Sequence, residues 1–150
     1  MKGGATSTIL YLPPMNSRAT AGYSGTPLPK KLGIRENSRV VLVHPPDRFE
    51  QKLKPIPTGA EIIEQASRSN VAVLFVKSKA ELIREVPVLA KKLPEKIAFW
   101  IAWPKQASGL QTDLKEGMVR EFGLAQGWVD YKVCAIDEIW SGLCFARKQN

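Results

Sequence analysis

Polar side chains that could bind a ligand follow three apolar runs of this sequence. His44, the only histidine, follows the first run, Lys77 and Ser78 follow the second, and Trp103 and Lys105 close the third. In a parallel sheet with crossover helices, strand C-termini and helix N-termini share one edge, and open α/β sheets bind ligands there. We therefore predict a binding site at that edge.

Hydroxyl groups at the start of a predicted short helix suggest what the ligand is. Thr26 is a natural N-cap before Pro27, and Gly33 is placed to end the helix. Helix N-termini attract anions, and nearby lysines would add positive charge. We expect a small anionic ligand, held here by Tyr23, Ser24, Gly25 and Thr26. The alternative is that these residues only cap a helix and shape a turn.

More candidate binding residues lie in the loop after the third run and in a turn near the C-terminus. The turn reaches the same edge if the strand before it runs parallel to the central strand, as in methyltransferase-like sheets. Asp137, Glu138 and Trp140 form an acidic-aromatic corner that could bind a cationic or hydroxylated group, and the alternative there is ordinary turn chemistry with a tryptophan that covers core. For Ser, Thr and Asp at helix starts, the alternative is ordinary capping. The residues are Ser108, Thr112, Asp113, Asp137, Glu138, Trp140 and Ser141.

The sequence shows no familiar catalytic or metal-binding pattern. His44 and Asp137 are weak candidates for a general base, and a lone histidine more often forms a structural hydrogen bond at a strand end. One histidine and two distant cysteines give no metal-ligand spacing, and no cofactor is indicated. Cys134 and Cys144 could face each other across a hairpin as a redox pair, or could simply be buried thiols.

The apolar runs also predict the elements that position these side chains. Ile97–Trp103 is apolar without alternation, which is typical of a strand buried on both faces of a parallel sheet with helices on each side. Ser78 with Glu81 has capping-box spacing and starts a helix that Pro87 should kink or divide. Asp113 has the same capping-box spacing from Glu116 and is predicted to begin the next helix.

The remaining segments complete an α/β fold. The segment 60–66 could be a strand or a helical turn, and 129–133 with 143–147 predicts an antiparallel hairpin at one edge. We predict a single-domain, Rossmann-like three-layer sandwich with a mostly parallel sheet and a C-terminal hairpin. The domain spans 21–150, after a flexible arm at 1–20 that lacks sustained periodicity.

Length, composition and charge limit the classes of protein to which this chain can belong. At 150 residues and 44% hydrophobic, the chain suits one core. It has no apolar run of the roughly 20 residues that a membrane span requires and no secretory signal pattern, so we expect a cytoplasmic protein with reduced thiols. A net charge of +8 admits nucleic acid as a partner, although Lys and Arg are spread along the chain as ordinary surface charge is.

Three motifs resemble a bacterial family known only as a domain of unknown function, found in actinobacteria and other soil lineages. They are AGYSGTPL with KLGI (21–34), AWPK with SG and TDL (102–114), and VCA with DE and WSGL (133–143). The resemblance covers about 21–148 and implies the domain boundary without implying an activity.

The order of elements is also similar to the second half of class I methyltransferases. Those enzymes place a glycine-rich loop after the first strand, whereas this chain has His44-Pro45-Pro46-Asp47-Arg48. Prolines lack amides, so S-adenosylmethionine binding of the usual kind is not expected. We predict a non-enzymatic or accessory module that binds a small anionic ligand or a protein partner. A reduced methyltransferase-like or other transferase, and a nucleic-acid-binding protein, are the alternatives.

Overall fold

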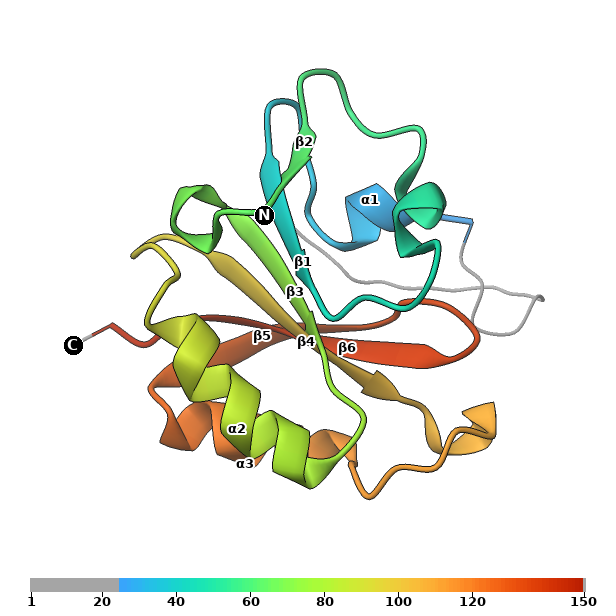
Figure 1. The fold of residues 1–150 in the computed structure, drawn as a ribbon, viewed down its shortest axis with the longest axis vertical. Helices are drawn as coiled ribbons and strands as arrows, with labels where there is room; N and C mark the ends of the chain where they lie inside the picture. The colour runs from blue at the N-terminus through green and yellow to red at the C-terminus, as the bar shows by residue number, and fades with distance from the viewer. Residues whose placement is uncertain (1–24, 150) are drawn as a thin grey trace.

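The computed structural model describes residues 25–149, so the predicted arm and residues Tyr23 and Ser24 lie outside the described part (Figure 1). The strands are β1 (Arg39–Val43), β2 (Glu61–Ile63), β3 (Val71–Phe75), β4 (Ala98–Pro104), β5 (Trp128–Ala135) and β6 (Trp140–Arg147). The helices are α1 (Leu28–Lys31), α2 (Lys79–Ala90) and α3 (Glu116–Ala125), with 3₁₀ turns η2 (Phe49–Leu53), η3 (Ala66–Arg68) and η4 (Gln106–Ser108).

The strands form one six-stranded sheet in the order β2-β1-β3-β4-β6-β5. β2, β1, β3 and β4 are parallel, whereas β6 is antiparallel to both of its neighbours, β4 and β5. β5 therefore runs in the same direction as β4. This mostly parallel sheet with an antiparallel C-terminal hairpin confirms the predicted α/β, Rossmann-like fold class.

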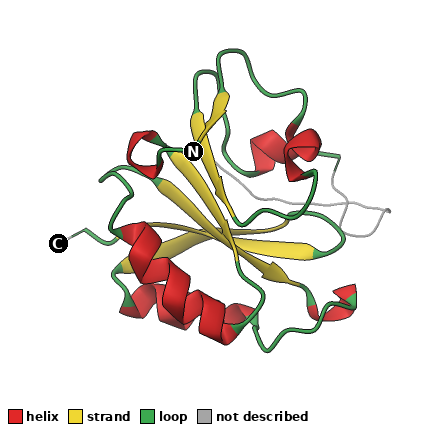
Figure 2. Ribbon diagram, viewed as in Figure 1, coloured by secondary structure: helices red, strands yellow, loops and turns green. Residues whose placement is uncertain are grey.

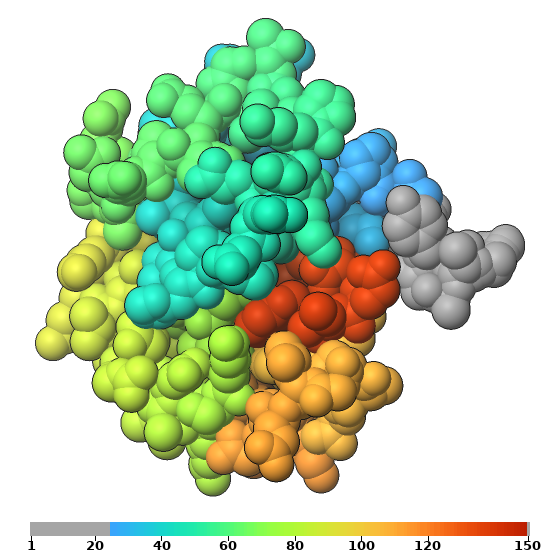
Figure 3. Space-filling view, turned by 45° about the vertical axis from the view of Figure 1, so that its right-hand side comes forward, coloured from blue at the N-terminus to red at the C-terminus, as the bar shows by residue number. Residues whose placement is uncertain are grey.

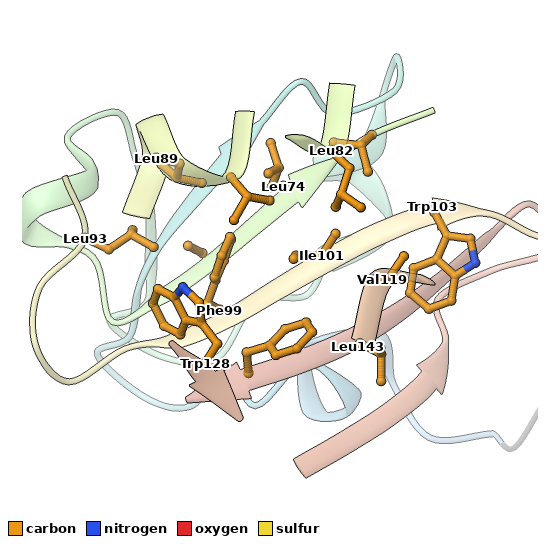
Figure 4. Close-up of a cluster of buried hydrophobic side chains, with 14 of the residues drawn as sticks. Leu74, Leu82, Leu89, Leu93, Phe99, Ile101, Trp103, Val119, Trp128 and Leu143 are labelled. Atoms are coloured by element: carbon orange, nitrogen blue, oxygen red, sulfur yellow. The ribbon is translucent and has the colours of Figure 1, made fainter. Parts of the chain in front are cut away.

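α2 and α3 cover one face of the sheet and enclose the first core cluster (Figure 4). β4 contributes Phe99, Ile101 and Trp103 to this cluster, and each is at most 4% exposed. α2 contributes its buried stripe of Leu82, Val86 and Leu89. The apolar run of β4 is buried on both faces, as the lack of alternation predicts.

The opposite face is covered by short helical turns and loops (Figure 2). Leu32 after α1, and Phe49 and Leu53 of η2, belong there to the second core cluster together with Trp100 of β4. The indole Nε1 of Trp100 donates a 2.9 Å hydrogen bond to the Leu32 carbonyl, so the one polar atom of this buried ring has a partner. The third layer of the sandwich is therefore present, but without a long helix.

α1 is shorter than predicted and begins differently. Pro27, and not Thr26, is its N-cap residue, and no side chain caps the helix. Pro27 and Pro29 both lack an amide hydrogen, so this helix start has few donors to offer. Gly33 adopts φ +79° after the helix, as predicted for the residue that ends it.

α2 is one helix that runs through Pro87, so of the two predicted effects of Pro87, a kink or a division, the division into two helices is wrong. Pro87 cannot donate to the carbonyl of Ile83, but Ile83 is 50% exposed and water can reach this side of the helix. At the other end of α2, the Arg147 guanidinium donates to the carbonyl oxygens of Ala90 (3.0 Å), Leu93 (2.9 Å) and Pro94 (3.3 Å). The same guanidinium stacks on Trp128, 4.6 Å from the ring centroid. β6 is thereby tied to the C-terminal end of α2.

α3 begins at Glu116, later than the predicted start at Asp113, and its N-cap residue is Lys115. It ends where predicted, because Gly127 follows it at φ +93°. Arg120 joins the helix to the sheet, donating to Asp130 of β5 (2.9 Å) and to Glu116 (2.7 Å). None of the helices in 25–149 is long and apolar enough to cross a membrane.

The hairpin has longer strands and a shorter turn than predicted. Ala135 pairs with Ser141, so the turn is centred on Glu138. Cys134 and Cys144 would lie opposite each other only if the turn were centred on Ile139. In the observed register, Cys134 lies opposite Gly142 and Cys144 lies opposite Lys132. The prediction that the two cysteines face each other is wrong, and both are unpaired thiols.

Two glycines of α3 should respond oppositely to alanine. A Cβ at Gly123 would lie 2.3 Å from Cε2 of Phe145, a core ring that is 0% exposed, whereas a Cβ at Gly117 meets nothing within 4 Å. Gly123→Ala should lower the free energy of unfolding by about 1–3 kcal/mol through overpacking. Gly117→Ala should raise it by up to about 1 kcal/mol. Urea denaturation measures both, and equal effects would contradict the packing described for Gly123.

Candidate functional site

The structure brings the ends of β1, β3 and β4 and the hairpin turn to one edge of the sheet. Pro104 at the end of β4 pairs with Trp140 at the start of β6, and the amide of Lys105 donates to the Ile139 carbonyl at 2.7 Å. In the space-filling view, the red-orange turn lies between the teal loop that follows β1 and the orange segment that follows β4 (Figure 3). We call this edge the rim.

The rim contains a small cavity of about 220 Å³, here called the rim cavity. Three of its residues belong to the set predicted from the sequence: His44 after β1, Lys77 after β3, and Trp140 of β6. The remaining lining residues are Phe75, Glu81, Arg84 and Glu85. Sequence reasoning missed these four, although Glu81, Arg84 and Glu85 have the spacing of one helix face at the start of α2.

His44 and Glu85 form a polar pair at the cavity. The imidazole Nε2 lies 3.2 Å from Glu85 Oε1, and Arg84 Nε donates to the other carboxylate oxygen at 3.1 Å. Hydrogen bonds from Arg84 and then from His44 lower the pKa of Glu85, so this carboxylate is ionised at neutral pH. His44 has φ +56°, a left-handed conformation that is uncommon for residues other than glycine, and its side chain is 61% exposed.

The N-terminus of α2 is already occupied by oxygen atoms of the protein itself. Asp113 Oδ1 accepts a 2.8 Å hydrogen bond from the Lys79 amide, and Ser78 Oγ accepts one from the Glu81 amide at 3.1 Å. The Glu81 carboxylate accepts from the Lys77 amide at 2.7 Å. Asp113 therefore caps α2, whereas the sequence assigned it to α3. A ligand anion at this helix start would have to displace a carboxylate.

A second, open hollow of about 380 Å³ lies beside this capped helix start. It is lined by Lys77, Ser78, Gln111, Thr112 and Asp113. The Thr112 hydroxyl accepts a hydrogen bond from the Leu114 amide at 3.1 Å, and Ser78 and Asp113 cap α2. These side chains therefore have structural hydrogen bonds, as in the alternative that treated them as ordinary caps and turns.

Asp137 organises the hairpin turn. Its Oδ1 accepts 2.8 Å hydrogen bonds from the Ile139 and Trp140 amides, and its Oδ2 accepts one from Lys52 Nζ at 2.9 Å. Burial alone would raise the pKa of Asp137, but the hydrogen bonds from Lys52 and from the two amides outweigh it, so the pKa is lowered. Both oxygens are engaged and proton affinity is reduced, which makes Asp137 a poor general base.

Several other predicted residues do not line the rim cavity. Trp103 is 4% exposed and packs in the core under α2 and α3, so it cannot contact a ligand at the rim. Ser108 accepts a hydrogen bond from the Leu110 amide at 3.1 Å. Gly25 and Thr26 are exposed before the four-residue α1, where the two prolines remove the amides that an anion site would need. The others are Lys105 and Ser141, both half-buried, and Glu138, which is exposed in the turn.

The described part of the chain contains no cluster of side chains suited to bind a metal ion. Within residues 25–149, no three His, Cys, Asp or Glu side chains are grouped so that they could hold a metal ion.

Comparisons with known proteins show the fold and no more. No protein-family model matches the sequence, and no curated protein is similar to it, so the resemblance to the domain-of-unknown-function family stays a prediction. An uncharacterised protein of Listeria monocytogenes serotype 4b is similar in structure, with a TM-score of 0.52, 10% identity, and coverage of 82% of this chain and 67% of that one.

Two further solved structures, one of them a methyltransferase, show weaker similarity. The M1A22 tRNA methyltransferase TrmK of B. subtilis has a TM-score of 0.49 and 7% identity over 83% of this chain and 66% of its own. The fibrillarin pre-rRNA processing protein of Methanococcus jannaschii has a TM-score of 0.47 and 10% identity over 77% and 69%. Neither similarity is close enough to assign an activity to this chain.

The cap that Asp113 provides should be measurable. Asp113→Ala removes the acceptor of the Lys79 amide and should lower the free energy of unfolding by about 1 kcal/mol. For a chain of this size, thermal denaturation should show a melting temperature lower by about 2–4 °C. Asp113→Asn keeps an oxygen acceptor and should lose less. Equal melting temperatures for Asp113→Ala and the unsubstituted protein would contradict the cap.

The turn carboxylate predicts an acid-sensitive contribution to stability. The pKa of Asp137 lies below its ordinary value of 3.8 in the folded protein, so its interactions stabilise the fold above that value. This contribution should disappear as the pH falls through the folded-state pKa. In urea titrations, the difference between the unsubstituted protein and Asp137→Asn should be full above about pH 5 and should shrink below about pH 4. A difference that stays constant down to about pH 2.5 would exclude this linkage.

Proposed function

We propose that the protein binds a small anionic ligand in the rim cavity, between Lys77 and Arg84. The observation that carries the proposal is the convergence of these two cations with His44 around a recess that has Phe75 and Trp140 in its wall. The cavity is formed by three regions that are remote in sequence: the end of β1, the segment from β3 into α2, and the start of β6.

The lining has two cations, Lys77 and Arg84, and two carboxylates, Glu81 and Glu85, so an anionic ligand is favoured only through the cations that remain able to pair with it. The two carboxylates of the lining are already hydrogen-bonded, Glu81 to the Lys77 amide and Glu85 to His44 and Arg84. Lys77 is exposed, so its ammonium group can pair with a ligand. Pockets for drug-sized ligands span roughly 300–1,000 Å³. A cavity of about 220 Å³ suits inorganic phosphate or a small carboxylate better than a nucleotide.

The loop after β1 disfavours a nucleotide-type cofactor as the ligand. His44 is followed by Pro45 and Pro46, so the segment has few amides and no glycine for the close backbone approach that a nucleotide-type cofactor makes after the first strand. The methyltransferase-like alternative therefore rests on the order of the strands alone. A protein partner at the same rim is the other mode of binding that the sequence led us to expect.

A second candidate function follows from the His44–Glu85 pair. Because Glu85 is ionised, it orients the imidazole by accepting from Nε2, which leaves Nδ1 able to accept a proton. This arrangement suits a general base in a small transferase or hydrolase. It requires a substrate that lies within hydrogen-bond distance of His44, and the ligand bound by Lys77 and Arg84 would supply one.

Thermal denaturation with inorganic phosphate as the probe tests the first proposal. A ligand at about 100 times its dissociation constant should add about 2.7 kcal/mol, because it binds only the folded protein. That corresponds to a rise of roughly 5–10 °C in melting temperature. The double variant Lys77→Ala/Arg84→Ala should lose this rise. Lys91→Ala/Lys92→Ala removes the same charge from the far end of α2 and should keep it.

The outcomes separate the candidates. If both double variants lose the rise in melting temperature equally, phosphate acts through overall charge. If phosphate does not raise the melting temperature of the unsubstituted protein at any concentration up to saturation, the rim proposal is wrong. Stabilisation by S-adenosylmethionine in place of phosphate would favour the methyltransferase-like alternative. If His44 is a base, His44→Asn should lower kcat for any substrate found by far more than it weakens phosphate binding.

A further inference from the structure

β5 has a bulge that places two large side chains on one face of the sheet. Asp130 pairs with Phe145 and Lys132 pairs with Cys144, so Tyr131 is the extra residue. Asp130 faces α3, where it binds Arg120. Tyr131 and Lys132 instead both reach the other face, where Tyr131 contacts Cys144 and Lys132 lies 5.9 Å from the Trp100 ring centroid. Bulges commonly re-aim side chains in this way.

Tyr131 is held in place although its ring is exposed. The thiol of Cys144 donates to the Tyr131 hydroxyl at 3.2 Å, and Cys144 is 1% exposed. Tyr131 as a whole is 60% exposed, so its hydroxyl is anchored although much of the residue is accessible to solvent. An exposed tyrosine that is already ordered loses little conformational entropy when another ring stacks on it.

Basic side chains from β5 and from the segment 31–35 lie along the strand that carries this tyrosine. Arg35, just after α1, is close enough to lower the pKa of Tyr131 against the raising effect of burial. Burial also raises the pKa of Cys134 to about 11, and the positive charges of Lys31, Lys132 and Lys105 each oppose that rise. Lys31 Nζ donates to the Ala135 carbonyl at the end of β5, at 3.2 Å. We call Tyr131, Lys132, Arg35 and Lys31 the β5 surface.

The acidic residues near β5 are mostly directed elsewhere. Asp130 binds Arg120 on the α3 face, and Asp137 binds Lys52 and two amides in the turn. Glu36 and Glu138 are exposed carboxylates at either end of this region. The charge of the β5 surface is therefore predominantly positive, in a protein whose net charge is +8.

We propose that the β5 surface binds single-stranded nucleic acid, with a base stacked on Tyr131 and phosphates paired with Lys132, Arg35 and Lys31. An aromatic ring on a sheet with cations around it is the arrangement that binds unpaired bases without sequence preference. The proposal is independent of the rim cavity. An acidic peptide could use the cations but has no need of the exposed ring, so the ring favours nucleic acid.

The test uses fluorescence anisotropy with a labelled oligothymidylate of about 15 nucleotides, which spans a typical single-strand site. Tyr131→Ala should weaken binding about tenfold or more, whereas Tyr131→Phe keeps a stacking ring and should stay within about threefold. The unfolding curve of each variant is measured beside its affinity. If Tyr131→Ala does not fold, the charge variants still decide the question.

The charge variants test the pairing with phosphates. Arg35→Ala/Lys132→Ala should reduce the slope of log affinity against log salt by about 1.4, which is about 0.7 for each phosphate that the variant no longer neutralises. Lys91→Ala/Lys92→Ala removes two charges from the C-terminal end of α2 and should leave slope and affinity within about twofold.

Four results would overturn the proposal. They are no binding at low salt, equal weakening by the two charge variants, unchanged affinity in a folded Tyr131→Ala protein, and equal competition by polyglutamate of matched charge. The last would indicate an acidic peptide as the partner. A matched DNA duplex, whose bases are already stacked on each other, should bind at least about fivefold more weakly than the single strand.

Discussion

The capped N-terminus of α2 is the constraint on which the candidate site depends. Asp113 reaches from the loop before α3 to the Lys79 amide, and Arg147 of β6 binds the last carbonyl groups beyond the other end. The two charges have the signs that the helix dipole favours. The helix that carries Glu81, Arg84 and Glu85 into the rim cavity is thus fixed at both ends by side chains from elsewhere in the fold.

The same cap limits the chemistry at the sheet edge. A helix start with unsatisfied amides would attract a phosphate, but here the chain supplies its own carboxylate and hydroxyl. Positive charge at the rim therefore comes from Lys77 and Arg84, whose side chains are exposed. At β5, lysine and arginine side chains lie along the strand that carries the exposed Tyr131. The two surfaces differ in shape, and this is why we assign them ligands of different classes.

The sequence predicted the sheet well because its signals are local. The unbroken apolar run of β4, the serine that caps α2 and the glycine that follows α3 depend on neighbours along the chain. The role of Asp113 could not be predicted from such local signals. Its spacing from Glu116 fits a capping box for α3, and only the packed fold reveals that the carboxylate caps α2. The pairing of His44 with Glu85, and the hairpin register that separates the cysteines, likewise depend on tertiary structure.

The strand order has a consequence for the chain as it is being synthesised. β6 lies between β4 and β5, although it follows both in sequence. Until β6 has left the ribosome, β5 has no partner in the sheet, and the edge of β4 stays open. The nascent protein therefore presents two unpaired edges that another chain could join, and β6 closes both at once when it inserts.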